Sequence, residues 1–82
     1  NEALSFVIPC DTQEEIDYFW NEFSKHGQES MCGWCKDQYG VSWQIVPSNI
    51  SDIMMDKNKG QVAMQALMKM KKIIITDLEN AH

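Results

Sequence analysis

The residues best suited to chemistry in this chain are Cys32 and Cys35, which form a Cys-x-x-Cys pair. Such a pair can act as a redox dithiol or supply half of a zinc site. A redox dithiol needs its first thiol at a helix N-terminus, where the helix dipole lowers the thiol pKa. Here a turn and a strand-like segment follow, and positions i and i+3 of a strand point to opposite faces. We therefore expect two ordinary buried or half-buried cysteines and keep a dithiol redox switch as the third hypothesis.

Other candidates for metal binding or catalysis are scattered along the chain. A zinc site needs a second pair of ligands at short spacing, and Cys10, His26 and His82 do not provide one. No Ser-His-Asp or Cys-His arrangement is recognisable. The glycines form neither a G-x-G-x-x-G loop nor a P-loop, which sets aside a nucleotide or adenosyl cofactor bound in that way. We predict no metal site and no cofactor for this chain alone.

Aromatic side chains on sheet-forming segments are the remaining candidates for a binding site. Packing in the core is the simpler interpretation, because large apolar rings are costly to leave in water. The alternative is that a concave sheet presents some of them as an aromatic pocket, in which an amide orients the ligand. The predicted ligand-binding residues are Phe6, Trp34, Tyr39, Trp43 and Gln44. The sequence predicts an unknown small molecule as the partner.

Composition limits the kinds of partner. The formal charge is −5, from 12 acidic and 7 basic residues, and every basic residue is a lysine. Without the planar fork of arginine, and with this acidic balance, nucleic acid and an anionic membrane are not expected partners. No apolar run approaches the roughly 20 residues that span a bilayer. The 3 cysteines are an odd number, which indicates reduced thiols in a cytoplasm rather than a disulfide framework.

The candidate residues must be positioned by the fold, and the first two segments of the chain are predicted to be a strand and a helix. Residues 3–9 alternate between two faces and end at a proline, as in a half-buried strand. Asp11 or Thr12 can cap the following helix, with a glutamate three residues later completing a capping box. Gly27 is a plausible end of this helix. The apolar stripe of the helix consists of Ile16, Phe19, Trp20 and Phe23.

Two further strands are predicted over residues 29–36 and 41–47. The turn between them, residues 37–40, opens with an aspartate and closes with a glycine, which suits a four-residue hairpin connection. Strands of this kind place alternate residues on one face, so Trp43 and Ile45 share a face and Gln44 lies on the other.

The C-terminal third is predicted to be helical. Ser48 or Ser51 can cap a short helix, and a longer amphipathic helix is expected from Gln61 onward. The apolar stripe of that helix consists of Ala63, Ala66, Leu67 and Met70. Residues 73–75 are short and β-branched, so their state is left open between helix and strand. Thr76 begins a capping box and is expected to open the last helical turn.

Three strands and one long helix leave the sheet incomplete. Its edges are unpaired, and a domain of this size buries only about 60–65% of the surface its unfolded chain exposes. The chain therefore needs a fourth strand, a second module or another copy of itself. We predict association on this ground, in the form of a homodimer.

Four segments resemble the PhnB-like branch of the glyoxalase/bleomycin-resistance superfamily, also called the vicinal oxygen chelate superfamily. They are residues 11–20, residues 32–34, the run Lys-Asp-x-Tyr-Gly-Val-Ser-Trp-Gln-Ile-Val-Pro at 36–47, and residues 64–73. Members of this branch are often catalogued as 3-demethylubiquinone-9 3-methyltransferase domain proteins. The resemblance covers nearly the whole chain.

The resemblance implies an α+β fold, a single βαββ(β) module whose curved sheet lines a cleft, with helices at the C-terminus. It also implies that residues 1–82 are one module, equivalent to the C-terminal half of a two-module member, with the sheet completed by a second module or chain. Related metal-dependent members carry His and Glu ligands on the strands that face the cleft. Strands 3–9 and 41–46 have neither, so a divalent metal would need ligands from another module. Cys35 stands where the family more usually has an apolar residue such as leucine.

The sequence therefore predicts a cytoplasmic, dimeric module of the glyoxalase/bleomycin-resistance type that binds an unknown small molecule. The alternative is an enzyme. Its chemistry would be that of a metal-assisted lyase or a dioxygenase with ligands from another module, or the catalogued methyl transfer, for which no adenosyl-cofactor motif is visible. Bound ligand, reaction and oligomer geometry are not given by the sequence.

Overall fold

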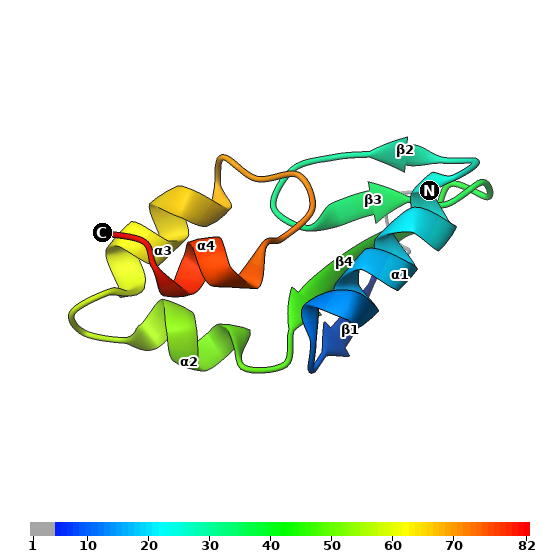
Figure 1. The fold of residues 1–82 in the computed structure, drawn as a ribbon. Coiled ribbons are helices and arrows are strands. Elements are labelled where there is room, and N and C mark those ends of the chain that lie inside the picture. The colour runs from blue at the N-terminus through cyan, green and yellow to red at the C-terminus, as the bar shows by residue number, and fades with distance from the viewer. Residues whose placement is uncertain (1–4) are drawn as a thin grey trace.

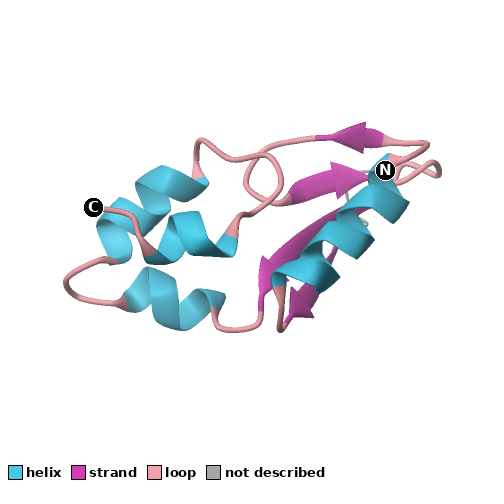
Figure 2. Ribbon diagram, in the orientation of Figure 1, coloured by secondary structure: helices cyan, strands magenta, loops and turns pink. Residues whose placement is uncertain are grey.

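The structure, a computed structural model, describes residues 5–82, which form an α+β fold with one four-stranded mixed sheet (Figures 1 and 2). The elements are β1 (Ser5–Cys10), α1 (Gln13–Ser24), β2 (Gln28–Glu29), β3 (Trp34–Lys36), β4 (Ser42–Pro47), α2 (Ile50–Met55), α3 (Gly60–Leu67) and α4 (Ile75–Glu79). The strand order is β1-β4-β3-β2, with β1 parallel to β4 and the other neighbours antiparallel. The predicted fold class is confirmed. Residues 3 and 4 of the predicted first strand lie outside the described residues.

Helix α1 forms because its first turn is closed by its own side chains. The Thr12 hydroxyl accepts a hydrogen bond from the Glu15 N–H at 3.1 Å, and the Glu15 carboxylate accepts one from the Thr12 N–H at 3.2 Å. This is the predicted capping box. The helix ends at Ser24, so the expectation that Gly27 ends it is wrong. Gly27 instead leaves room for β3, since a Cβ there would overlap the Lys36 carbonyl oxygen.

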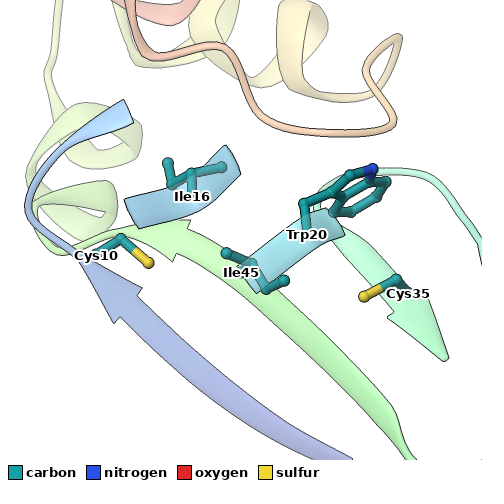
Figure 3. Close-up of a cluster of buried hydrophobic side chains, with 5 residues drawn as sticks. All are labelled: Cys10, Ile16, Trp20, Cys35 and Ile45. Atoms are coloured by element: carbon teal, nitrogen blue, oxygen red, sulfur yellow. The ribbon is translucent and has the colours of Figure 1, made fainter. Parts of the chain in front are cut away.

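The first hydrophobic cluster lies between α1 and the sheet. Ile16 and Trp20 of the helix point toward the strands and are buried, as the apolar stripe predicts (Figure 3). They meet residues from three strands, which are Cys10, Cys35 and Ile45. One face of the sheet is therefore packed by α1, which crosses it as Figure 1 shows.

The predicted single strand over residues 29–36 is wrong, because the chain turns back on itself inside it. Cys32 and Gly33 have φ angles of 61° and 81°, in the left-handed region and far from the extended backbone of a strand. The Cys32 N–H donates to the Met70 carbonyl oxygen at 2.7 Å, and the Gly33 N–H donates to Lys71 at 2.8 Å. These bonds fix the turn against the segment between α3 and α4. The result is two short strands, so the chain itself supplies the fourth strand of the sheet.

The hairpin turn at residues 37–40 is confirmed. One oxygen of the Asp37 carboxylate accepts hydrogen bonds from the backbone N–H groups of Tyr39 and Val41, at 2.9 and 3.0 Å. Gly40 closes the turn with a φ of 83°, which glycine adopts at little cost. An aspartate that bonds its own following backbone is a strong local turn former.

Helices α2, α3 and α4 gather beyond one end of the sheet (Figure 1). A second hydrophobic cluster joins them to the end of β4, and its buried members are Val46, Leu67, Ile73 and Leu78. Helix α2 contributes Ile50 and Met54, which are partly buried against it. The N-cap of α2 is Asn49, without a side-chain bond, so neither Ser48 nor Ser51 caps it. Helix α3 begins at Gly60, one residue before the predicted start. Among the helices of residues 5–82, none is long and apolar enough to cross a membrane.

The start of α4 is held by a side chain from the other end of the sequence. The Gln13 side-chain oxygen accepts a hydrogen bond from the Ile75 N–H at 2.8 Å. The Gln13 amide nitrogen donates a hydrogen bond to the Ile73 carbonyl oxygen at 2.9 Å. The Lys72 ammonium lies 2.9 Å from the Asp17 carboxylate and lowers its pKa. The predicted capping box at Thr76 is wrong, because the N-cap of α4 is Ile74, two residues earlier, and Thr76 lies inside the helix.

Candidate functional site

The two faces of the sheet differ in whether α1 packs on them. Cys35, Trp43 and Ile45 pack toward α1, in the first cluster, and we call this side the α1 face. Since successive strand residues alternate, the remaining strand residues point to the opposite side, which we call the open face. Its strand residues are Ser5, Val7, Pro9, Gln28, Trp34, Lys36, Ser42, Gln44 and Val46. Val46, at one end of this face, belongs to the second cluster, with the helices α2–α4.

Strand register places three residues of the open face in one row. Gln44 is paired with Val7 on β1 and with Trp34 on β3. Val7 is 58% exposed, while Trp34 and Gln44 are half-buried. The Gln44 amide nitrogen donates to the Cys32 carbonyl oxygen at 3.1 Å, which fixes the amide against the β2–β3 turn. This row therefore combines an aliphatic side chain, an oriented amide and an indole.

Phe6 and Trp43 lie on the α1 face, away from that row. The Trp43 ring stacks on Phe23 of α1, with centroids 4.6 Å apart and an interplanar angle of 11°, and it contacts Phe6 at 5.1 Å. The Trp43 indole N–H donates to the Asp37 carboxylate at 2.9 Å and, as the main cause, lowers the pKa of that group. Trp43 thus joins the helix, the sheet and the hairpin turn.

Tyr39 occupies a third place, at the tip of the hairpin turn, where it is 82% exposed. It borders a shallow cavity of about 170 Å³ whose other lining residues are Glu22, Phe23, His26, Asp37 and Gln38. The five predicted ligand-binding residues are therefore distributed over three places. The structure brings together Trp34 with Gln44, and separately Phe6 with Trp43.

The two cysteines of the Cys-x-x-Cys pair belong to different hydrophobic clusters. Cys35 is buried on the α1 face, where burial raises the pKa of its thiol to about 11. Cys32 lies in the β2–β3 turn and packs against the second cluster. Both are free thiols. A neutral, buried thiol is a poor nucleophile, because the thiolate is the reactive form. This geometry gives the dithiol hypothesis no support.

Of the strand residues of the open face, Trp34 and Gln44 are site residues predicted from the sequence, and Val7, Lys36 and Ser42 are among those that were not predicted. Lys36 is two residues from Trp34, and Ser42 is two residues from Gln44, on the same strand. Val7 is paired with Gln44 on the neighbouring strand. The period of two could have indicated Lys36 and Ser42, but Val7 needed the β1–β4 register. Within residues 5–82 there is no group of three or more His, Cys, Asp or Glu residues that could hold a metal ion.

Comparison with known proteins gives a family for this chain. The sequence model of the family described as 3-demethylubiquinone-9 3-methyltransferase matches residues 1–46, more than half of the 82 residues. The match runs through β1, α1, β2 and β3 and into β4, so it includes all four strands of the sheet and the helix that packs on its α1 face. A search of curated proteins finds no match. By its sequence match, the chain belongs to the 3-demethylubiquinone-9 3-methyltransferase family.

Proposed function

We propose that this chain is a small-molecule-binding module of the glyoxalase/bleomycin-resistance type, that its ligand lies on the open face, and that it acts as a homodimer. The observation that carries the proposal is the row Val7–Gln44–Trp34 on a sheet face that α1 does not cover. Apolar surface beside a few oriented polar groups is the usual make-up of a small-molecule site. The family match and the strand order β1-β4-β3-β2 support the module type.

The ligand site is tested with a neutral aromatic probe, 2-naphthamide, added to the isotope-labelled chain in an NMR titration. We expect the Trp34 indole N–H signal and the Gln44 amide signals to shift together. The indoles of Trp20 and Trp43 are internal controls, because they donate to Glu29 and Asp37 on the α1 face. Trp34→Ala should weaken binding about two- to tenfold, the usual size of an aromatic contact. Shifts confined to Trp43, or no shift at Trp34, would contradict the proposed site.

The homodimer is proposed from β1, an edge strand of the sheet formed by residues 5–82, in which β4 is its neighbour. The Cys10 carbonyl oxygen accepts a bond from the Ser48 N–H, so the backbone of Cys10 faces β4. In a parallel pair alternate residues face the neighbouring strand, which leaves Ser5, Val7 and Pro9 facing outward. Pro9 has no N–H to offer, whereas Ser5 and Val7 present one each. An open edge of this kind pairs readily with another strand. A second copy placed there would extend the open face and complete the site from both sides.

Val7→Pro is expected to abolish the dimer while leaving the fold intact. It removes an outward N–H and leaves the β1–β4 ladder untouched, and proline is tolerated on edge strands in that orientation. The measurement is solution mass by light scattering, which should fall from twice the 9.5 kDa chain mass to that mass.

Val7→Ala is the matched control, because it shortens the same side chain and keeps the N–H. It should remain dimeric. A folded wild-type chain that is monomeric at every concentration would refute the homodimer.

A further inference from the structure

We infer that the ligand of the open face is a small, soluble amphipathic carboxylate, with its apolar part against Trp34 and its carboxylate toward Lys36. This inference rests on the proposed function, because it names the ligand class of the same face. The supporting observation is that the charged strand residues of opposite sign lie on opposite faces of the sheet.

The acidic residues of the strands and their hairpin turn are placed on the α1 side. Glu29 is paired with Cys35, a member of the α1 face, and accepts a hydrogen bond from the Trp20 indole at 3.3 Å. The Asp37 carboxylate accepts a hydrogen bond from the Trp43 indole N–H at 2.9 Å. On the open face, the strand residues of the described part of the chain include no carboxylate and one lysine, Lys36. In a chain of net charge −5, this face is locally cationic.

Lys36 is available to a ligand. It is exposed, and the one ion pair found within residues 5–82 joins Lys72 to Asp17. Lys36 is paired with Ser42, which is paired in turn with Ser5. The row Ser5–Ser42–Lys36 therefore offers an ammonium group and two hydroxyls, donors that suit a carboxylate.

The spacing of the rows sets the size of the ligand. The polar row Ser5–Ser42–Lys36 is two residues along the strands from the row Val7–Gln44–Trp34. Two residues of strand span about 7 Å, so a carboxylate at the polar row places a one- or two-ring body on Trp34 and Val7. Beyond them, Val46 is buried by the second cluster and closes that end of the face. The polar end of the ligand is therefore directed toward Lys36.

The test compares three probes of one shape and different charge: 2-naphthoate, 2-naphthamide and protonated 2-naphthylmethylamine. Each is titrated into the isotope-labelled 82-residue chain and followed by the Trp34 indole signal. We expect 2-naphthoate to bind about two- to fivefold more tightly than the amide, as for an exposed ion pair, and the amine to bind most weakly. Raising the salt from about 20 to about 300 mM should weaken binding of the naphthoate alone, because salt screens an exposed charge pair.

Lys36→Gln should remove the preference for the carboxylate, so that 2-naphthoate and 2-naphthamide bind equally. Lys57→Gln, on the exposed loop between α2 and α3, is the matched control and should change neither affinity. Equal binding of naphthoate and naphthamide, unaffected by Lys36→Gln, overturns the carboxylate inference while the proposed site stands. If no probe shifts the Trp34 signal, the proposed function fails and the inference fails with it.

Discussion

Gly33→Ala is expected to destabilise the fold by about 2–4 kcal/mol, from left-handed strain and overpacking together. At a φ of 81° an alanine is strained, and its Cβ would lie 2.8 Å from the Ile73 Cδ1 and 2.9 Å from the Ile45 carbonyl oxygen. The turn cannot move away easily, because the Gly33 N–H is bonded to Lys71. The measurement is the free energy of unfolding in urea, followed by circular dichroism.

Gly40→Ala is the matched control for this substitution. Gly40 has nearly the same φ, 83°, but a Cβ there meets nothing within 4 Å. It should therefore show the backbone strain alone, about 1 kcal/mol. Adding Ile73→Val to Gly33→Ala removes the Cδ1 atom in the way, so the double variant should lose less than the sum of the single losses. Equal losses at the two glycines would contradict the packing argument.

Ile73→Ala is expected to cost about 3–4 kcal/mol, as for a large-to-small change at a fully buried site. Ile73 is 0% exposed and belongs to the second cluster, where it packs with Val46 of β4. Its backbone oxygen also accepts the bond from Gln13 that ties α1 to the start of α4. Loss of its side chain should loosen all the C-terminal helices from the sheet, measured as a lower urea midpoint.

Ile74→Ala is the control for this second substitution, since it makes the same chemical change one residue away. Ile74 is half-buried and lies in neither hydrophobic cluster. Its loss should cost about 1 kcal/mol, near the centre of the range for single substitutions. Equal effects at residues 73 and 74 would show that Ile73 does not join the helices to the sheet.

Elements that close their own hydrogen bonds within a few residues could be predicted from the sequence. The capping box of Thr12 and Glu15 and the turn opened by Asp37 both involve groups at most four residues apart. Their residue types therefore carry the necessary information. The same holds for the apolar stripe of α1, whose Ile16 and Trp20 face the sheet.

Elements fixed by distant partners could not be predicted. The interruption at Cys32 depends on backbone bonds to Met70 and Lys71, and alternation alone predicted one continuous strand. Likewise, α4 starts where Gln13, more than sixty residues earlier, accepts the Ile75 N–H. The local Thr-x-x-Glu pattern therefore gave the wrong cap.

The Cys-x-x-Cys pair and the aromatic residues show the same difference between features fixed by neighbouring residues and features fixed by distant ones. The sequence by itself determined which side chains were available, the Asp37 turn, and that Trp43 and Gln44 must face opposite ways, because a strand alternates with period two. Only the tertiary structure decided which face α1 covers and therefore that Trp34 and Gln44, with Val7 and Lys36, share the open one. The physical reason is that strand register and helix placement are set by contacts between segments far apart in the chain, which no local pattern records.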